Sequence, residues 1–143
     1  MTDIDNILNM LDWHMPQETQ LQGRFLANKL ETFVPFIQPL TPKHNKNVWE
    51  NCAIIISQKT DEELFPYLIK LFEWIQDLNW PGAYLIYDRL FSIQNDKLFF
   101  SFEYALRKSK ETQDKVWEEV LIEFGNKKKL IFKGDNQGTV RNH

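Results

Sequence analysis

The chain has 143 residues, of which 43% are hydrophobic and 26% charged, with a formal net charge of −3. This apolar content is enough for the core of one folded domain and argues against intrinsic disorder, while the small negative charge argues against nucleic acid as a partner. Cys52 is the only cysteine, which excludes an internal disulfide and a thiolate metal cluster.

The beginning of the chain predicts two helices. Residues 3–13 carry apolar side chains at helical spacing, and Asp3 is a residue type that caps helix N-termini. Residues 16–33 resume that spacing after Pro16, because proline is tolerated in the first turn of a helix. The side chains of this second helix that we expect to face the core are Leu21, Phe25, Leu26 and Leu30.

A proline-rich segment separates these helices from a third. Pro35, Pro39 and Pro42 interrupt the helical pattern, because proline lacks the backbone amide that a helix interior needs. The spacing of apolar residues then predicts a helix over 47–57, with Cys52 on its inward face.

The fourth predicted helix, residues 61–78, has the clearest pattern. Thr60 and Glu63 form a capping-box pair at its start, and Pro81 indicates that the helix ends before that residue. Pro66 lies in the second turn. It is either accommodated near the helix start or delays the regular helix by a few residues.

Three more helices fit residues 81–91, 97–108 and 114–124, joined by short polar segments. The tail from 127 to 143 is polar, basic and poorly patterned, so we expect it to add little to the fold. The sequence therefore predicts a single α-helical domain over residues 1–126 followed by this tail.

Six to seven helices with brief connections predict an all-α fold of antiparallel neighbours. A weak internal repeat favours a HEAT- or armadillo-like stack of helical hairpins, and an irregular helical bundle is the alternative. In two places a Trp and a Pro precede an amphipathic helix that ends in a basic residue and Leu, namely Lys29-Leu30 and Arg89-Leu90. A repeat of roughly 30 to 35 residues is typical of helical-hairpin arrays.

The sequence also bears on location. The acidic start, Met1–Asp5, lacks the basic and apolar regions of an export signal. No apolar run approaches the roughly 20 residues that a membrane-spanning helix needs. We therefore expect a cytoplasmic protein with no membrane segment.

The sequence shows no familiar catalytic motif. It contains no phosphate-binding glycine loop, dinucleotide fingerprint, nucleophile elbow or pair of histidines at metal-ligand spacing. His14 is far from the other histidines, and Cys52 fits an inert core cysteine better than a nucleophile. We identify no catalytic or metal-binding residue and expect no cofactor. The basic run Lys127–Lys129 is either a solvated tail or a contact for a phosphate-rich partner.

Tryptophans at three predicted turns are the main candidates for a binding surface. In a stack of hairpins, equivalent turns line up along one edge, so Trp13, Trp49 and Trp80 could form a row that faces a partner. In the structural alternative, Trp80 fixes a turn and Asp77 or Asn79 caps the next helix. The candidate partner-binding residues are Asp12, Trp13, His14, Lys46, Asn47, Trp49, Glu50, Asp77, Asn79 and Trp80.

The stretch Glu73–Pro81, EWIQDLNWP, together with residues 42–57, 61–64 and 66–68, resembles a bacterial family known as domain of unknown function 5071. The resemblance covers about half of the chain well. Gly82 departs from the small aliphatic residue expected after the proline. The resemblance implies a compact, helical-repeat-like domain and supplies no reaction, cofactor or catalytic residue.

The sequence leaves the partner and the oligomeric state open, and it favours a non-enzymatic protein-interaction domain. By analogy with small bacterial helical domains, a toxin-neutralising immunity protein is a narrower form of this hypothesis. One alternative is a helical-repeat enzyme or nucleic-acid-processing protein with Asp12, Asp77 and His14 around a groove. Another is a structural subunit whose turn residues only cap helices.

Overall fold

A computed structural model describes residues 4–39 and 46–131, and within these residues the fold is all-helical. The elements are α1 (Ile4–Met10), α2 (Gln17–Asn28), η1 (Val34–Phe36), η2 (Lys46–Val48), α3 (Trp49–Ser57), α4 (Asp61–Leu64), η3 (Phe65–Tyr67), α5 (Leu68–Trp74), α6 (Ala83–Phe91), α7 (Asn95–Glu111) and α8 (Lys115–Lys128), where η denotes a 3-10 turn. No helix in the described part combines the length and apolar character needed to cross a membrane.

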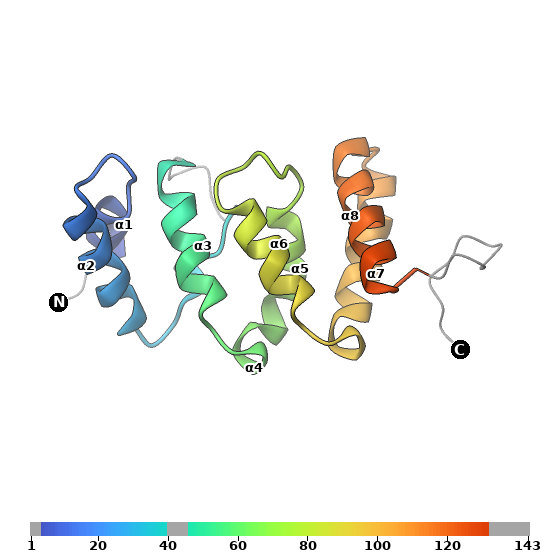
Figure 1. Ribbon diagram of the computed structural model, residues 1–143, viewed down its shortest axis with the longest axis horizontal. Coiled ribbons are helices and arrows are strands. Elements are labelled where there is room, and N and C mark those ends of the chain that lie inside the picture. The colour runs from blue at the N-terminus through green and yellow to red at the C-terminus, as the bar shows by residue number, and fades with distance from the viewer. Residues whose placement is uncertain (1–3, 40–45, 132–143) are drawn as a thin grey trace.

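The helices form a row along the longest axis of the molecule (Figure 1). Helices α2, α3, α6 and α8 lie nearer the viewer, while α1, α5 and α7 lie behind them. Helix α1 packs on α2, α5 on α6, and α7 on α8, and α3 packs on both α2 and α6. The row therefore places the turns between consecutive helices at two opposite edges.

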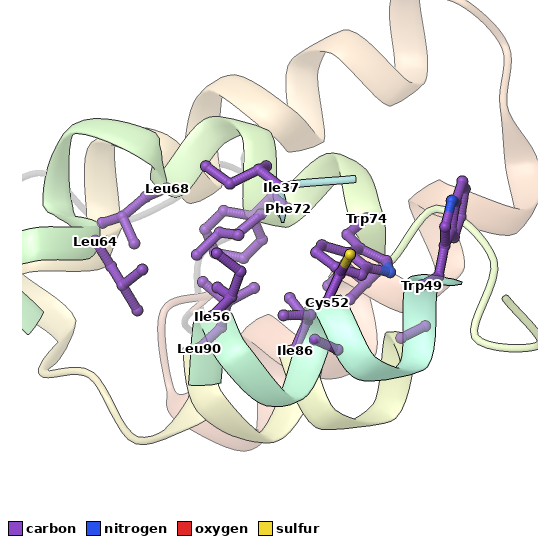
Figure 2. Close-up of a cluster of buried hydrophobic side chains, with 14 of the residues drawn as sticks. Ile37, Trp49, Cys52, Ile56, Leu64, Leu68, Phe72, Trp74, Ile86 and Leu90 are labelled. Atoms are coloured by element: carbon purple, nitrogen blue, oxygen red, sulfur yellow. The ribbon is translucent and has the colours of Figure 1, made fainter. Parts of the chain in front are cut away.

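The second place in the back row is filled by a segment without a full helix. The predicted interruption is confirmed at Pro35, where only the short turn η1 forms and packs against α3. Ile37, which follows η1, is 2% exposed and joins the core beside α3 and α5 (Figure 2). An apolar side chain from a segment without a regular α-helix thus contributes to the core.

The fourth predicted helix begins and breaks as its sequence indicates. The capping box is present, since Thr60 accepts a hydrogen bond from the Glu63 amide and the Glu63 carboxylate accepts one from the Thr60 amide. Pro66 lies in the 3-10 turn η3 between α4 and α5. The regular helix ends at Trp74 and does not reach residue 78.

The inward face predicted for α2 is wrong at two positions. Leu21 and Phe25 are each 55% exposed, whereas Gly23 and Ala27 are buried. Gly23 lies so close to α1 that an added Cβ would be 2.9 Å from the Met10 Cβ. Close packing on α1 requires this small residue, and so α2 turns its larger apolar side chains outward.

Polar groups join α2 to α3. The side-chain amide of Asn51, on α3, donates to the Leu11 carbonyl at 2.7 Å and to the Gln20 Oε1 at 2.9 Å. Arg24 of α2 donates to the Asn51 Oδ1. Because Asn51 is only 3% exposed, each of these bonds satisfies a polar group that would otherwise be costly to bury.

A continuous apolar core runs through α3, α5 and α6. Figure 2 shows Cys52, Ile56, Phe72, Trp74 and Leu90 gathered between these helices, and each is fully buried. Burying an apolar side chain of this size stabilises a fold by about 1.5–3 kcal/mol relative to leaving it in water. This core fixes the helices that carry the turns.

Basic side chains connect successive helices of the front row at one edge. The Lys59 ammonium donates to the Asn28 Oδ1 at 3.3 Å, at the end of α2. The Arg89 guanidinium donates to the Lys59 carbonyl at 2.8 Å and to the Asp61 carboxylate at 2.6 Å. The Lys128 ammonium donates to the carbonyls of the α6 C-terminal region, Phe91 and Ile93. Cations suit these places because the ends of helices carry unsatisfied carbonyls.

The helical body extends slightly beyond the boundary expected after residue 126. Helix α8 ends at Lys128, and Leu130 is only 3% exposed. The Lys129 amide closes the helix on the Asn126 carbonyl with a left-handed backbone. The first part of the predicted tail, 127–131, therefore belongs to the packed structure, and 132–143 lies outside the described residues.

We predict that Arg89→Leu lowers the free energy of unfolding by about 1.5–3 kcal/mol, because it leaves the Asp61 carboxylate and the Lys59 carbonyl without their cationic donor. Lys29→Leu is the matched control. Lys29 occupies a corresponding helix end, but it is exposed and lies over the Phe25 ring, so its loss should change stability by less than about 0.5 kcal/mol. Urea unfolding followed by fluorescence measures both, and equal effects would contradict the bridging role.

Candidate binding cleft

Three turns that carry the candidate residues lie at the same edge of the row. These are the α1–α2 turn, the start of α3 and the α5–α6 turn, all at the top of Figure 1. The Trp13 amide donates to the Asn47 carbonyl at 3.1 Å and so joins the first turn to the second. The Gly82 amide donates to the Glu50 carboxylate at 3.1 Å and joins the second to the third.

The first turn is organised around Asp12. Its carboxylate accepts a hydrogen bond from the His14 amide at 2.8 Å and lies 3.0 Å from the His14 ring nitrogen. The hydrogen bond from the His14 backbone is the main reason that the pKa of Asp12 lies below its usual range. The Asn47 side chain lies 3.3 Å from the same His14 nitrogen. These contacts fix the shape of the α1–α2 turn.

The three predicted tryptophans do not form an exposed row. Trp49 is 5% exposed and packs edge-on against Trp74 and Trp80, with ring centroids 6.1 and 5.4 Å apart. Trp13 is 46% exposed and packs beside His14. Trp49 is therefore a core residue, because it fills the space between α3 and α5. Of the other two predicted tryptophans, only Trp80 packs against it.

Lys46 lies over the aromatic pair formed by Trp49 and Trp80. Its ammonium is 5.3 Å from the Trp80 ring centroid and 5.7 Å from that of Trp49. Such contacts contribute about 0.5–1 kcal/mol at exposed sites. The contact places a positive charge at the rim of the third turn.

Asp77 and Asn79 shape the turn from within. The Asp77 carboxylate accepts a hydrogen bond from the Asn79 amide at 2.9 Å, and the Trp80 amide donates to the Asp77 carbonyl at 3.0 Å. Asp77 therefore bonds within its own turn, whereas Asp12 and His14 bond to each other and approach Asn47. The two carboxylates proposed for a catalytic groove serve separate turns.

An open cleft lies where the α5–α6 turn meets α6. Five of the residues that line it have apolar or aromatic side chains, and the others are one carboxylate, one amide and a glycine. They are Glu50, Leu78, Asn79, Trp80, Pro81, Gly82, Tyr84 and Leu85. The sequence predicted Glu50, Asn79 and Trp80 as contact residues, and the structure brings these three together.

Tyr84 is the lining residue that the sequence reasoning missed. It is 64% exposed, in the first turn of α6. The inward stripe of this helix consists of Ala83, Ile86 and Leu90, all fully buried. Tyr84 falls outside that stripe, and this spacing is the signal that could have found it.

A second hollow on the same edge is more polar. It lies between α5 and the α7–α8 turn and is lined by Glu73, Gln76, Lys108, Thr112, Gln113, Asp114, Lys115, Val116 and Trp117. Lys108 and Glu73 face each other across it at 3.4 Å. A partner's charge could therefore pair with Glu73 or Lys108 only in competition with this ion pair.

Catalytic groups do not converge at either place in the described residues. No three His, Cys, Asp or Glu side chains gather there as a metal site. Burial raises the pKa of the Cys52 thiol to about 12, so this cysteine is protonated and enclosed in the core.

Comparison with known proteins identifies a family that covers most of the chain. The model of a family described as a domain of unknown function (DUF5071) matches residues 40–137. The chain belongs to this family. The aromatic cleft lies wholly within the range matched by DUF5071, whereas α1, α2 and the Asp12–His14 turn precede it. No curated protein and no solved structure shows significant similarity to the chain.

We predict that Gly82→Ala destabilises the protein by about 2–4 kcal/mol, which combines the cost of a left-handed backbone with that of overpacking. Gly82 has φ of 79°, and a Cβ there would lie 2.6 Å from the Ala53 Cβ and 2.9 Å from the Trp49 carbonyl oxygen. Asn79→Ala, in the same turn but exposed, should cost less than about 0.5 kcal/mol. Chemical unfolding of the two variants tests this, and similar losses would refute the packing argument.

Proposed function

We propose that the protein is a non-enzymatic protein-interaction domain that holds a partner in the aromatic cleft. The observation that carries this proposal is the exposed ring of Tyr84, which lines the same cleft as Trp80 between α3, the α5–α6 turn and α6. Large aromatic side chains supply much of the binding energy at protein interfaces, because they bury a large area and lose little conformational freedom.

The order of the cleft supports this role. Trp80 is held by its edge-on contact with Trp49, and the Glu50 carboxylate by the Gly82 amide. A surface that is already fixed loses less entropy on binding. The Lys46 ammonium lies over the Trp80 ring at the rim of the cleft. It would attract a partner segment in which a carboxylate lies next to an apolar side chain.

We propose further that the row of helices is a divergent HEAT- or armadillo-like stack. Lys29, Lys59 and Arg89 lie at intervals of 30 residues, each near the end of a front-row helix. The repetition of this position agrees with a repeat of helical hairpins. The buried free thiol of Cys52 suits a reducing compartment, which is the basis for proposing a cytoplasmic location.

Site-specific photocrosslinking in cells of the native organism tests the binding role. We expect p-benzoylphenylalanine in place of Tyr84 to give a discrete protein adduct, because a bound partner would lie against this position. The same residue in place of Leu21, which is also exposed but on α2, should give no such adduct. Lys46→Glu should lower the yield at position 84 about tenfold, since it reverses the charge at the rim.

The photocrosslinking result distinguishes binding at the cleft from its absence. An adduct at position 84 that Lys46→Glu reduces supports the cleft as the binding site. No adduct at position 84, or equal adducts at positions 84 and 21, would contradict it.

A further inference from the structure

A second set of exposed aromatic side chains lies on η3 and α7, and α7 belongs to the back row of helices (Figure 1). Phe65 of η3 is 55% exposed and Phe100 of α7 is 70% exposed, and Tyr104 of α7 is 36% exposed. Ile69 of α5 is half-buried. A single exposed apolar side chain is common on protein surfaces, whereas several that form one contiguous patch are typical of an interaction surface.

Two ion pairs align the segment that carries Phe65 and Ile69 with the segment that carries Phe100 and Tyr104. Glu62 pairs with Lys97 at 3.8 Å, and Glu73 pairs with Lys108 at 3.4 Å. The same difference of 35 positions separates the two members of each pair, and α5 packs directly on α7. The two segments therefore run parallel in a constant register, which places Phe65 level with Phe100 and Ile69 level with Tyr104. We call these four residues the back patch.

The charges around the back patch differ between its ends. At the end where α7 begins, Glu62 and Asp96 lie beside Lys97. At the other end, Lys70 and Arg107 are exposed, and the Arg107 guanidinium lies 5.7 Å from the Tyr104 ring centroid. The patch thus has an acidic end and a basic end with an apolar centre.

We propose that the back patch binds a second copy of this chain in an antiparallel, two-fold arrangement. A two-fold axis across the middle of the patch places each α7 against the other α7 in the reverse direction. Phe100 of one copy then lies opposite Tyr104 of the other, and Asp96 comes near Arg107. On α4, η3 and α5, the same axis sets Phe65 opposite Ile69 and brings Glu62 near Lys70.

This arrangement satisfies both the apolar and the charged parts of the surface. The acidic end of one copy meets the basic end of the other, so the charges attract at both ends of the interface. A parallel arrangement would set like charges against each other. Self-association through this face leaves the aromatic cleft on the turn edge accessible, and it does not depend on the proposed function.

Sedimentation equilibrium of the purified full chain over about 5–200 µM, the range in which a weak dimer gains population by mass action, tests the proposal. We expect a monomer–dimer equilibrium that Phe100→Ser weakens at least tenfold. Leu21→Ser, which removes an exposed apolar residue elsewhere, should leave it unchanged. A chain that is monomeric throughout this range would overturn the proposal, as would a dimer that Phe100→Ser does not weaken.

A charge exchange tests the antiparallel register. Asp96→Arg and Arg107→Asp should each weaken the dimer about tenfold, and the double variant should recover most of the wild-type affinity because opposite charges again face each other. Both residues are exposed, so circular dichroism should show a folded protein in every case. A double variant weaker than either single variant would overturn the arrangement.

Discussion

The close approach of the α5–α6 turn to α3 is the contact on which the aromatic cleft depends. Gly82 has a left-handed backbone, and its lack of a Cβ lets the turn lie directly on Ala53 and the Trp49 carbonyl. The Trp74 indole donates to the Pro81 carbonyl at 3.2 Å from the core side. With the turn held in this way, Trp80 packs on Trp49 and the Glu50 carboxylate receives the Gly82 amide. The shape of the exposed surface is therefore set by the buried one.

The two edges of the row have different chemistry. One edge carries aromatic rings and turns that are joined by hydrogen bonds from backbone amides, and it contains the cleft. The other carries basic side chains that bond across successive helix ends, through Lys59, Arg89 and Lys128. Bonds that span neighbouring helices stabilise the row as a whole. The turn edge can then present exposed aromatic side chains while the opposite edge and the core maintain the fold.

Much of the fold was predictable from the sequence, because helical periodicity and caps are local signals. The capping box at Thr60 and the interruptions at Pro35 and Pro66 are examples. Which residues of α2 face the core could not be predicted in the same way. An apolar stripe shows that a helix has a buried side, but the need for Gly23 against α1 depends on how closely the two helices pack.

The site was predictable only in part, for a similar reason. The density of tryptophans identified the turns, yet burial of Trp49 and partial exposure of Trp80 depend on which ring enters the space between α3 and α5. Tyr84 was missed because a tyrosine in an amphipathic helix looks like ordinary core. Its position outside the stripe formed by Ala83, Ile86 and Leu90 is the signal that indicates its exposure.

The most direct test of a preformed partner-binding cleft is NMR chemical-shift mapping. The isotope-labelled protein is titrated with the partner that photocrosslinking identifies. We expect the largest amide shifts on titration in residues 46–50 and 78–85, with little change in the remainder of α3, α5 and α6. Shifts concentrated on the edge that carries Lys59 and Arg89, with the cleft unaffected, would contradict it.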